Sequence, residues 1–163
     1  MNKPNYGSRK STRFNSYDYA STGYYFITIN AKEFQYIFGK IKNGVMYPNK
    51  LGEIIQKEWE YSATLRTNIK LHEYVVMPNH FHGIIEICYS KGHKNIPGEF
   101  RAPSHSIGAV IRGFKGAVTR RNNALGIGNE KGIWQVNYYD RIIRDQQELF
   151  NVKNYIENNV KKW

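Results

Sequence analysis

The chain has 163 residues, close to the length of about one domain, so a second hydrophobic core is not expected. Apolar residues make up 40% of it and aromatic residues 15%, which can fill one core and excludes a wholly disordered chain. Its 24 lysines and arginines against 13 acidic residues leave a net charge of +11. That excess favours a polyanion as the partner, with nucleic acid ahead of an anionic membrane.

Cysteine content and apolar runs indicate the compartment. Cys88 is the one cysteine and cannot form an internal disulfide. No apolar run approaches the roughly 18 residues of a membrane span, and residues 1–4 do not resemble a secretory signal. We therefore expect a cytoplasmic protein with no membrane partner.

Residues 1–16 predict a flexible basic arm. The first acidic residue is Asp18, and the stretch before it holds Gly, Ser and Asn with almost no apolar side chain. Such a segment is expected to lack a fixed structure of its own. Its uncompensated cations are Lys3, Arg9, Lys10 and Arg13. Residues 17–163 are expected to form one domain.

The first half of this domain predicts strands followed by a helix. Residues 24–30 are almost entirely aromatic or β-branched and predict a central strand. A hairpin is expected over 36–47, because Asn43-Gly44 readily supplies the positive φ angles of a type I′ turn. Asn49 can cap a helix reaching about residue 62, with helically spaced apolar residues Leu51, Ile54, Ile55 and Trp59.

The second half adds two strands and a helix before the last pair of elements. Residues 74–77 and 80–88 predict strands that part at Pro78-Asn79, because proline cannot donate to a β-ladder. A helix is predicted from Ser104 to about Arg121, where apolar residues recur at helical spacing.

Residues 138–143 predict one more strand, and a final helix starts at about Gln146. The apolar stripe of that helix is Leu149, Val152, Ile156, Val160 and Trp163. The complete order is three strands, a helix, two strands, a helix, a strand and a helix. This order predicts an α+β sandwich with a central antiparallel sheet, and a ferredoxin-like core fits it.

His80 and His82 are the first candidates for chemistry. Because side chains alternate between the faces of a strand, the two imidazoles point the same way, roughly 7 Å apart along the chain. That spacing suits a shared metal ion, while Phe81 points to the packed face. From this triplet alone, two ordinary histidines on a half-exposed sheet are an equally good interpretation.

Tyr155 and Asn159 form an i,i+4 pair on one side of the final helix. Both lie at the border of its apolar stripe, from which a side chain can reach across a sheet surface. Composition does not single out Tyr155, since the chain has 13 tyrosines and a packed ring with a solvated hydroxyl is the default for each.

A second basic region lies between Arg101 and Asn129, which holds five cations and no acid. Arg112, Lys115 and Thr119 align opposite the apolar stripe of their helix and could follow a phosphate backbone. The alternative is an ordinary solvated face. Together with the arm, these residues give a predicted DNA-binding set of Arg9, Lys10, Arg13, Arg112, Lys115, Arg120 and Arg121.

Two stretches of the chain resemble a known family. Residues 74–83, Tyr-Val-Val-Met-Pro-Asn-His-Phe-His-Gly, resemble the His-hydrophobic-His segment of the single-tyrosine HUH transposases. That family includes bacterial insertion-sequence transposases and REP-associated tyrosine transposases. Trp134-Gln135, residues 137–144 and residues 154–159 complete the match in the family's order and separation, over about 17–163. One departure is Val160, where many relatives have proline.

The resemblance implies a function and assigns roles to four residues. His80 and His82 match the metal-binding histidines, Tyr155 matches the nucleophile, and Asn159 matches the third metal ligand. The implied activity is that of a metal-dependent endonuclease and strand transferase for single-stranded DNA, a transposase that nicks and rejoins near hairpins through a 5′-phosphotyrosyl intermediate. The implied cofactor is Mg²⁺ or Mn²⁺.

The implied partner is single-stranded DNA with hairpin structure, and the implied location is the bacterial cytoplasm, in association with the nucleoid. A monomer and a homodimer, with Tyr155 acting in its own subunit or across the dimer, both stay open. So do two other functions. One is a noncatalytic single-stranded nucleic-acid binder, which needs none of the four site residues as a set. The other is a zinc hydrolase that adds His72, His93 or His105 to His80 and His82.

Overall fold

The structure, a computed structural model, describes residues 20–89, 106–128 and 132–163. The predicted arm with Arg9, Lys10 and Arg13 lies outside the described residues, as do Arg101, His93 and His105. Four strands form one antiparallel sheet in the order β4-β5-β1-β6. Their bounds are β1 Gly23–Asn30, β4 Ile69–Val76, β5 His80–Ile87 and β6 Tyr139–Ile143.

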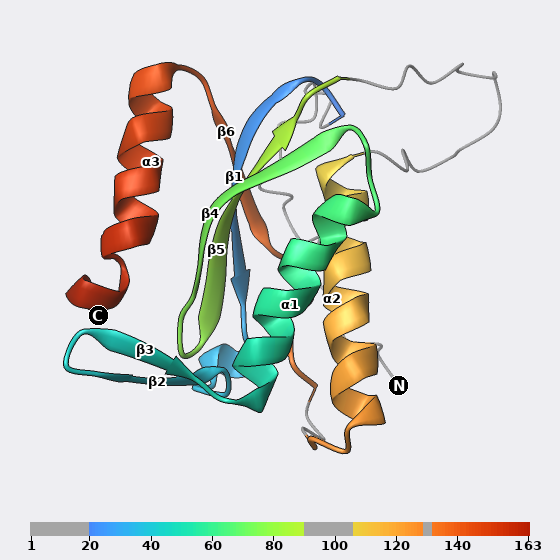
Figure 1. Cartoon of the computed structure of the whole chain (residues 1–163), viewed down its shortest axis with the longest axis vertical. Coiled ribbons are helices and arrows are strands. Elements are labelled where there is room, and N and C mark those ends of the chain that lie inside the picture. The colour runs from blue at the N-terminus through green and yellow to red at the C-terminus, as the bar shows by residue number, and fades with distance from the viewer. Residues whose placement is uncertain (1–19, 90–105, 129–131) are drawn as a thin grey trace, which may run out of the picture.

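Helices cover both faces of this sheet (Figure 1). Helices α1 (Lys50–Thr64) and α2 (Ile107–Ala124) pack on one face, and α3 (Gln146–Asn158) lies on the other. The order β1-α1-β4-β5-α2-β6, with β1 and β5 at the centre of the sheet, is the ferredoxin-like arrangement. The predicted α+β sandwich with a central antiparallel sheet is therefore confirmed, and α3 is added to its open face.

The predicted hairpin forms a separate two-stranded sheet, β2 (Gly39–Lys42) and β3 (Val45–Pro48), inserted between β1 and α1. Asn43 and Gly44 have φ angles of 51° and 70°, as the predicted type I′ turn requires. Asn49 caps α1 as expected, since its side chain accepts a hydrogen bond from the Gly52 N–H at 3.0 Å.

Several boundaries differ from the sequence prediction, and three of the differences are explained by the structure. Strand β4 starts at Ile69, five residues early, because residues 69–71 pair with β5 despite their polar neighbours. Helix α2 starts at Ile107 because Ser106 is its cap. Helix α3 ends at Asn158 and a 3-10 turn, η2 (Val160–Lys162), follows it, so the apolar stripe stops at Ile156 and Trp163 is half exposed.

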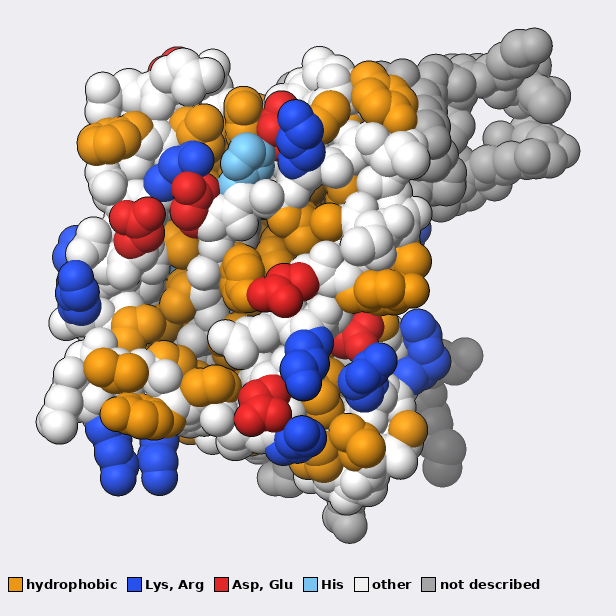
Figure 2. Space-filling view, in the orientation of Figure 1, with side chains coloured by type: hydrophobic (Ala, Val, Ile, Leu, Met, Phe, Trp, Pro, Cys, Tyr) orange, Lys and Arg blue, Asp and Glu red, His pale blue; other side chains and the backbone are white. Residues whose placement is uncertain are grey.

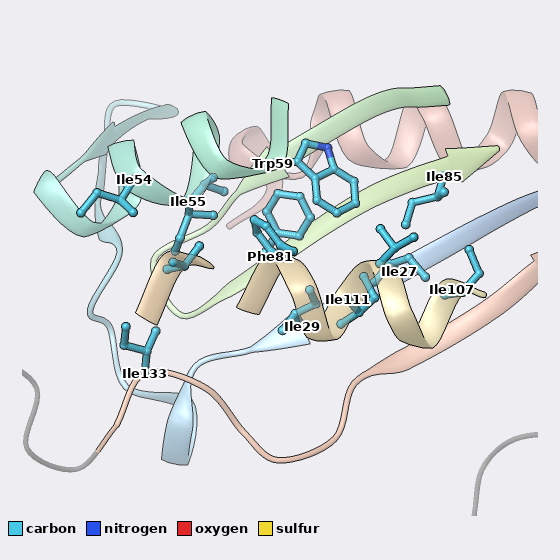
Figure 3. Packing of buried hydrophobic residues seen from close by; sticks show 14 of the residues in the cluster. Ile27, Ile29, Ile54, Ile55, Trp59, Phe81, Ile85, Ile107, Ile111 and Ile133 are labelled. Carbon is cyan, nitrogen blue, oxygen red and sulfur yellow. The ribbon is translucent and has the colours of Figure 1, made fainter. Parts of the chain in front are cut away.

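Two apolar clusters hold the layers together. The larger one fills the space between the sheet and α1 and α2, where the rings of Trp59 and Phe81 lie 4.6 Å apart (Figure 3). The smaller one lies under α3 and consists of Ile84, Ile143, Leu149 and Ile156. Strand β5 thus contributes to both clusters, and its alternation leaves His80 and His82 on the α3 face, as predicted.

Gly83 generates a prediction about this packing. A Cβ atom at Gly83 would lie 2.7 Å from Cζ2 of Trp59 and 3.0 Å from Cε1 of Phe81. Because both rings are fully buried, we expect Gly83→Ala to lower the free energy of unfolding by about 1 to 3 kcal/mol through overpacking. Urea denaturation measures it against Gly128→Ala, whose Cβ would meet nothing within 4 Å. Equal stability of the two variants would contradict this account.

Candidate active site

His80 and His82 form the centre of the candidate site on β5. Their ring centroids are 4.6 Å apart, closer than the separation along the strand, and the rings meet edge to face with 70° between their planes. The His82 side chain is buried and that of His80 is partly buried. The ring of Phe26, on the neighbouring strand β1, stacks on the His82 ring with 5.1 Å between centroids. The two imidazoles therefore share one site.

A neighbouring side chain fixes the orientation of each imidazole through Nδ1. The Nδ1–H of His80 donates to Oδ1 of Asn79 at 2.7 Å. The amide of Asn79 is itself oriented, because its Nδ2 donates to the carbonyl of Phe34. Nδ1 of His82 is hydrogen-bonded to the hydroxyl of Thr28 at 2.8 Å. The Asn79 oxygen can only accept, so the proton of neutral His80 lies on Nδ1 and its Nε2 keeps a lone pair for a metal ion or a hydrogen-bond donor. The Thr28 hydroxyl can accept from or donate to Nδ1 of His82.

Helix α3 brings Tyr155 to this pair. The hydroxyl of Tyr155 lies 3.3 Å from Nε2 of His82, in a hydrogen bond that joins residues 73 positions apart. The ring of Phe26 meets the ring of Tyr155 edge to face, with 6.0 Å between centroids. Tyr155 is 45% exposed, so its oxygen faces both the imidazole and the solvent. The sequence left Tyr155 as one tyrosine among many, and the structure places it beside the histidines.

Asn159 lies between two contacts with the histidines. Tyr155 touches His82 one helical turn before it, and the Trp163 ring lies 5.5 Å from the His80 ring one turn after it. Asn159 is buried, with 8% of its surface exposed. Because i and i+4 residues share a face, Asn159 lies on the same side of the segment as Tyr155, over the sheet.

Burial keeps both imidazoles neutral. Desolvation lowers the pKa of His80 to about 4. Burial, assisted by the neighbouring His80, lowers the pKa of His82 to about 3. A neutral imidazole with its Nδ1 proton held elsewhere is the form that binds a metal ion. The chemistry of these donors therefore fits a divalent cation.

Within the described residues, no cluster of three or more His, Cys, Asp or Glu side chains could hold a metal ion. His72 instead donates from Nε2 to Glu86 at 2.8 Å. In this part of the chain a third protein ligand for His80 and His82 must therefore be of another kind, and the amide oxygen of Asn159 is such a group. A zinc site that recruits His72 receives no support.

A hollow of about 680 Å³ opens beside Tyr155, between β6, β1 and the start of α3. Its walls include Phe26, Arg141, Arg144 and Asn151. Arg141 pairs with Glu148, whose second oxygen accepts the backbone N–H of Arg144. The hollow therefore combines an aromatic ring with two arginines and two carboxylates, those of Asp145 and Glu148, beside Tyr155. Sequence analysis did not anticipate it, because Phe26 and Arg141 meet only through strand pairing.

The predicted cations of α2 lie across the sheet from this site. Arg112 and Arg120 are exposed. Arg121 is paired with Glu58 at 2.6 Å. The ammonium group of Lys115 donates to the carbonyls of Gln135 and Val136, and burial lowers its pKa. Lys115 therefore has a structural role in fixing that loop, and DNA binding by this face stays a prediction.

Two positioning residues escaped the sequence analysis. Thr28 is an unremarkable strand residue until β1 and β5 pair, when it stands directly opposite His82. Asn79 directly precedes His80, so the sequence places the two residues together. Only the structure shows that the amide of Asn79 orients the His80 imidazole.

Comparisons with known proteins agree with this architecture. No known protein-family profile matches the sequence. The solved structure of a REP-associated tyrosine transposase bound to a REP hairpin matches 93% of this chain and 74% of its own, with a TM-score of 0.62 and 18% identity. A predicted transposase from Deinococcus radiodurans R1 matches 91% of this chain and 97% of its own, with a TM-score of 0.52 and 17% identity. The chain thus has the fold of the tyrosine transposases.

A Haemophilus influenzae protein, described only as uncharacterized, is 39% identical over 166 residues that cover 95% of this chain and 89% of the relative. The chain belongs to the same family as this protein. The resemblance to single-tyrosine HUH transposases seen in the sequence is confirmed in the fold. Among the described residues, no helix is long and apolar enough to span a membrane.

The lowered pKa values generate a prediction for the metal-free protein. Both imidazoles should stay neutral from pH 8 to pH 5, whereas the same side chains in an unfolded chain take up protons below about pH 6.5. Stability should therefore decrease as the pH falls from about 6.5 toward 4, because the unfolded state then binds more protons. NMR titration of the imidazole signals, assigned with His80→Gln and His82→Gln, measures the pKa values of the two side chains. Midpoints near 6.5 would contradict the burial argument.

Proposed function

We propose that the protein is a metal-dependent enzyme that nicks and rejoins single-stranded DNA, acting in transposition or in the processing of chromosomal repeats. Tyr155 is the nucleophile in this proposal, and His80, His82 and Asn159 are the metal ligands. The observation that carries it is the hydrogen-bond distance of 3.3 Å between the Tyr155 hydroxyl and Nε2 of His82, in a histidine pair that desolvation keeps neutral.

The chemical step exchanges one phosphodiester bond for another. The Tyr155 oxygen forms a bond to phosphorus, and the bond between phosphorus and the 3′-oxygen breaks. The phenol loses its proton and the leaving 3′-oxygen gains one, so the products are a 5′-phosphotyrosyl link and a free 3′-hydroxyl. Because the two diesters are similar in energy, a 3′-hydroxyl can reverse the step and join new ends.

Each residue around Tyr155 has a role in this step. A bound divalent cation would supply positive charge that polarises the scissile phosphate and offsets the charge that develops on it. Asn79 and Thr28 each orient one imidazole through its Nδ1, and Phe26 packs against both His82 and Tyr155. The partial exposure of Tyr155 gives a DNA strand access to its oxygen.

The proposed substrate is a single strand that carries a hairpin. The related fold of the REP-associated tyrosine transposase was solved with a REP hairpin, which supports this substrate class. The net charge of +11 supports binding to a polyanion. Arg141 and Arg144, at the hollow beside Tyr155, can contact phosphates next to the scissile bond.

The decisive experiment incubates the purified protein with single-stranded genomic DNA that flanks its gene, with Mn²⁺ or Mg²⁺, and detects covalent protein-DNA adducts. We expect Tyr155→Phe to abolish the adducts and to leave DNA affinity nearly unchanged, because only the nucleophilic oxygen is removed. Adducts separate on denaturing gels, and affinity is measured by fluorescence anisotropy.

Tyr139→Phe is the matched control, because Tyr139 is 48% exposed on β6 and pairs with Thr28. It should form adducts like the wild type. Adducts that persist in Tyr155→Phe and disappear in Tyr139→Phe would assign the nucleophile to β6 instead. A wild-type protein that binds the DNA without any adduct would favour the noncatalytic binder.

A second prediction tests the metal ligand on α3. Asn159→Ala should raise the Mn²⁺ concentration that gives half-maximal cleavage by about tenfold or more, because a neutral oxygen ligand is lost. The neighbouring Asn158 provides a control, since its amide donates to the carbonyl of Asn154 within the helix. Asn158→Ala should leave the metal requirement unchanged. An unchanged requirement in a folded Asn159→Ala protein would remove Asn159 from the site.

A further inference from the structure

The candidate site continues into a row of aromatic rings. The His82 ring is followed by His80 at 4.6 Å, Trp163 at 5.5 Å and Tyr36 at 5.9 Å, measured between ring centroids. The row starts beside Tyr155 and leads away from it along the α3 side of the molecule. His82 is buried, His80 is partly buried, and Trp163 and Tyr36 are exposed.

Trp163 and Tyr36 are large aromatic side chains that remain exposed to solvent. Trp163 is 50% exposed and Tyr36 is 67% exposed, whereas Trp59 is fully buried in the main core. The two rings meet edge to face, with 68° between their planes, and this contact leaves part of each ring surface open to solvent. Figure 2 shows hydrophobic side chains on this side of the molecule, over the β2–β3 hairpin and the segment after α3, with basic side chains beside them.

Lysines gather near the two rings, although the exposed Glu33 lies three residues before Tyr36. Strand β3 lies against η2, which brings the hairpin next to the segment that carries Trp163. Residues 39–48 and 158–163 contain no acidic residue. They contain four lysines, all exposed, which are Lys40, Lys42, Lys161 and Lys162.

We propose that Tyr36 and Trp163 form a stacking platform for an unpaired base of the DNA strand whose backbone passes the histidine pair. Unpaired bases stack on exposed aromatic rings, and neighbouring lysines neutralise the phosphates between them. The face of a paired base is covered within a duplex, so the platform selects single-stranded DNA. This inference rests on the proposed function for the identity of the strand.

The platform also explains the position of Trp163. Contact with His80 places one edge of its ring at the candidate metal site, so a base stacked on Trp163 belongs to a nucleotide close to the scissile phosphate. Trp163 and Tyr36 thereby fix the position of the strand relative to the Tyr155 oxygen. They bind substrate without taking part in the bond exchange.

Tryptophan fluorescence tests the platform directly. Trp163 is the exposed one of three tryptophans, since Trp59 is buried and Trp134 is partly buried. A 20-nucleotide strand without self-complementarity, added at low salt, should quench the emission, and Trp163→Phe should remove that quenching. A perfect duplex of the same length should quench much less. Equal quenching by the duplex would overturn the selection of unpaired bases.

Affinity measurements complete the test. Trp163→Ala should weaken binding of the single strand by about 5- to 100-fold. Tyr36→Ala, which leaves the contact between Trp163 and His80 in place, should also weaken binding. Tyr61→Ala is the matched control, because Tyr61 is 56% exposed on α1, across the sheet. It should bind like the wild type. Wild-type affinity in both platform variants would overturn the proposal.

These measurements distinguish failure of the stacking platform from failure of the proposed nicking activity. Covalent adducts without any change in Trp163 fluorescence would overturn the platform and leave the nicking activity standing. Quenching and loss of affinity in the variants, without adducts in the wild type, would support the platform and contradict the nicking activity.

Discussion

The candidate site depends on the packing of α3 against the open face of the sheet. A helix of 13 residues is not stable alone in water, so its position comes from the contacts that it buries. These are Leu149 and Ile156, which meet Ile84 and Ile143, and an ion pair of 2.9 Å between Lys153 and Glu73. Burial of Ile156 fixes the rotation of α3, and Tyr155, the preceding residue, is thereby directed to His82. The geometry of the hydroxyl and the imidazole is a consequence of this small apolar cluster.

The two faces of the sheet divide stability from chemistry. Beneath α1 and α2 the core is large and aromatic, with Trp59, Phe81 and Phe114 in mutual contact. This packing makes β5 rigid, and rigidity of the strand is what holds two imidazoles 4.6 Å apart. The other face is only partly covered, so its histidines are desolvated enough to stay neutral while Tyr155 remains accessible. A larger cluster under α3 would bury the tyrosine, and a smaller one would leave the helix without a fixed rotation.

Much of the fold follows from local patterns in the sequence. The turn at Asn43-Gly44, the cap at Asn49 and the break at Pro78 each depend on one or two residues, and the structure contains all three features. The alternation around Phe81 likewise put both histidines on one face. Strand β4 was predicted too short because the polar residues His72 and Glu73 separate residues 74–77 from its first three residues, which pair with β5. Trp163 was placed on an apolar stripe because a periodic pattern does not show where a helix gives way to a 3-10 turn.

The site itself combines residues whose proximity no local pattern encodes. His82 and Tyr155 come together because α3 returns over the face of β5 that carries the histidines, and the family resemblance supplied that connection before the structure did. Thr28 and Phe26 had no signal at all, since their importance arises from the register in which Thr28 stands opposite His82. A single-residue slip of that register would turn both side chains to the other face. The pairing of β1 with β5 therefore places both side chains against the His82 imidazole that the Tyr155 hydroxyl contacts.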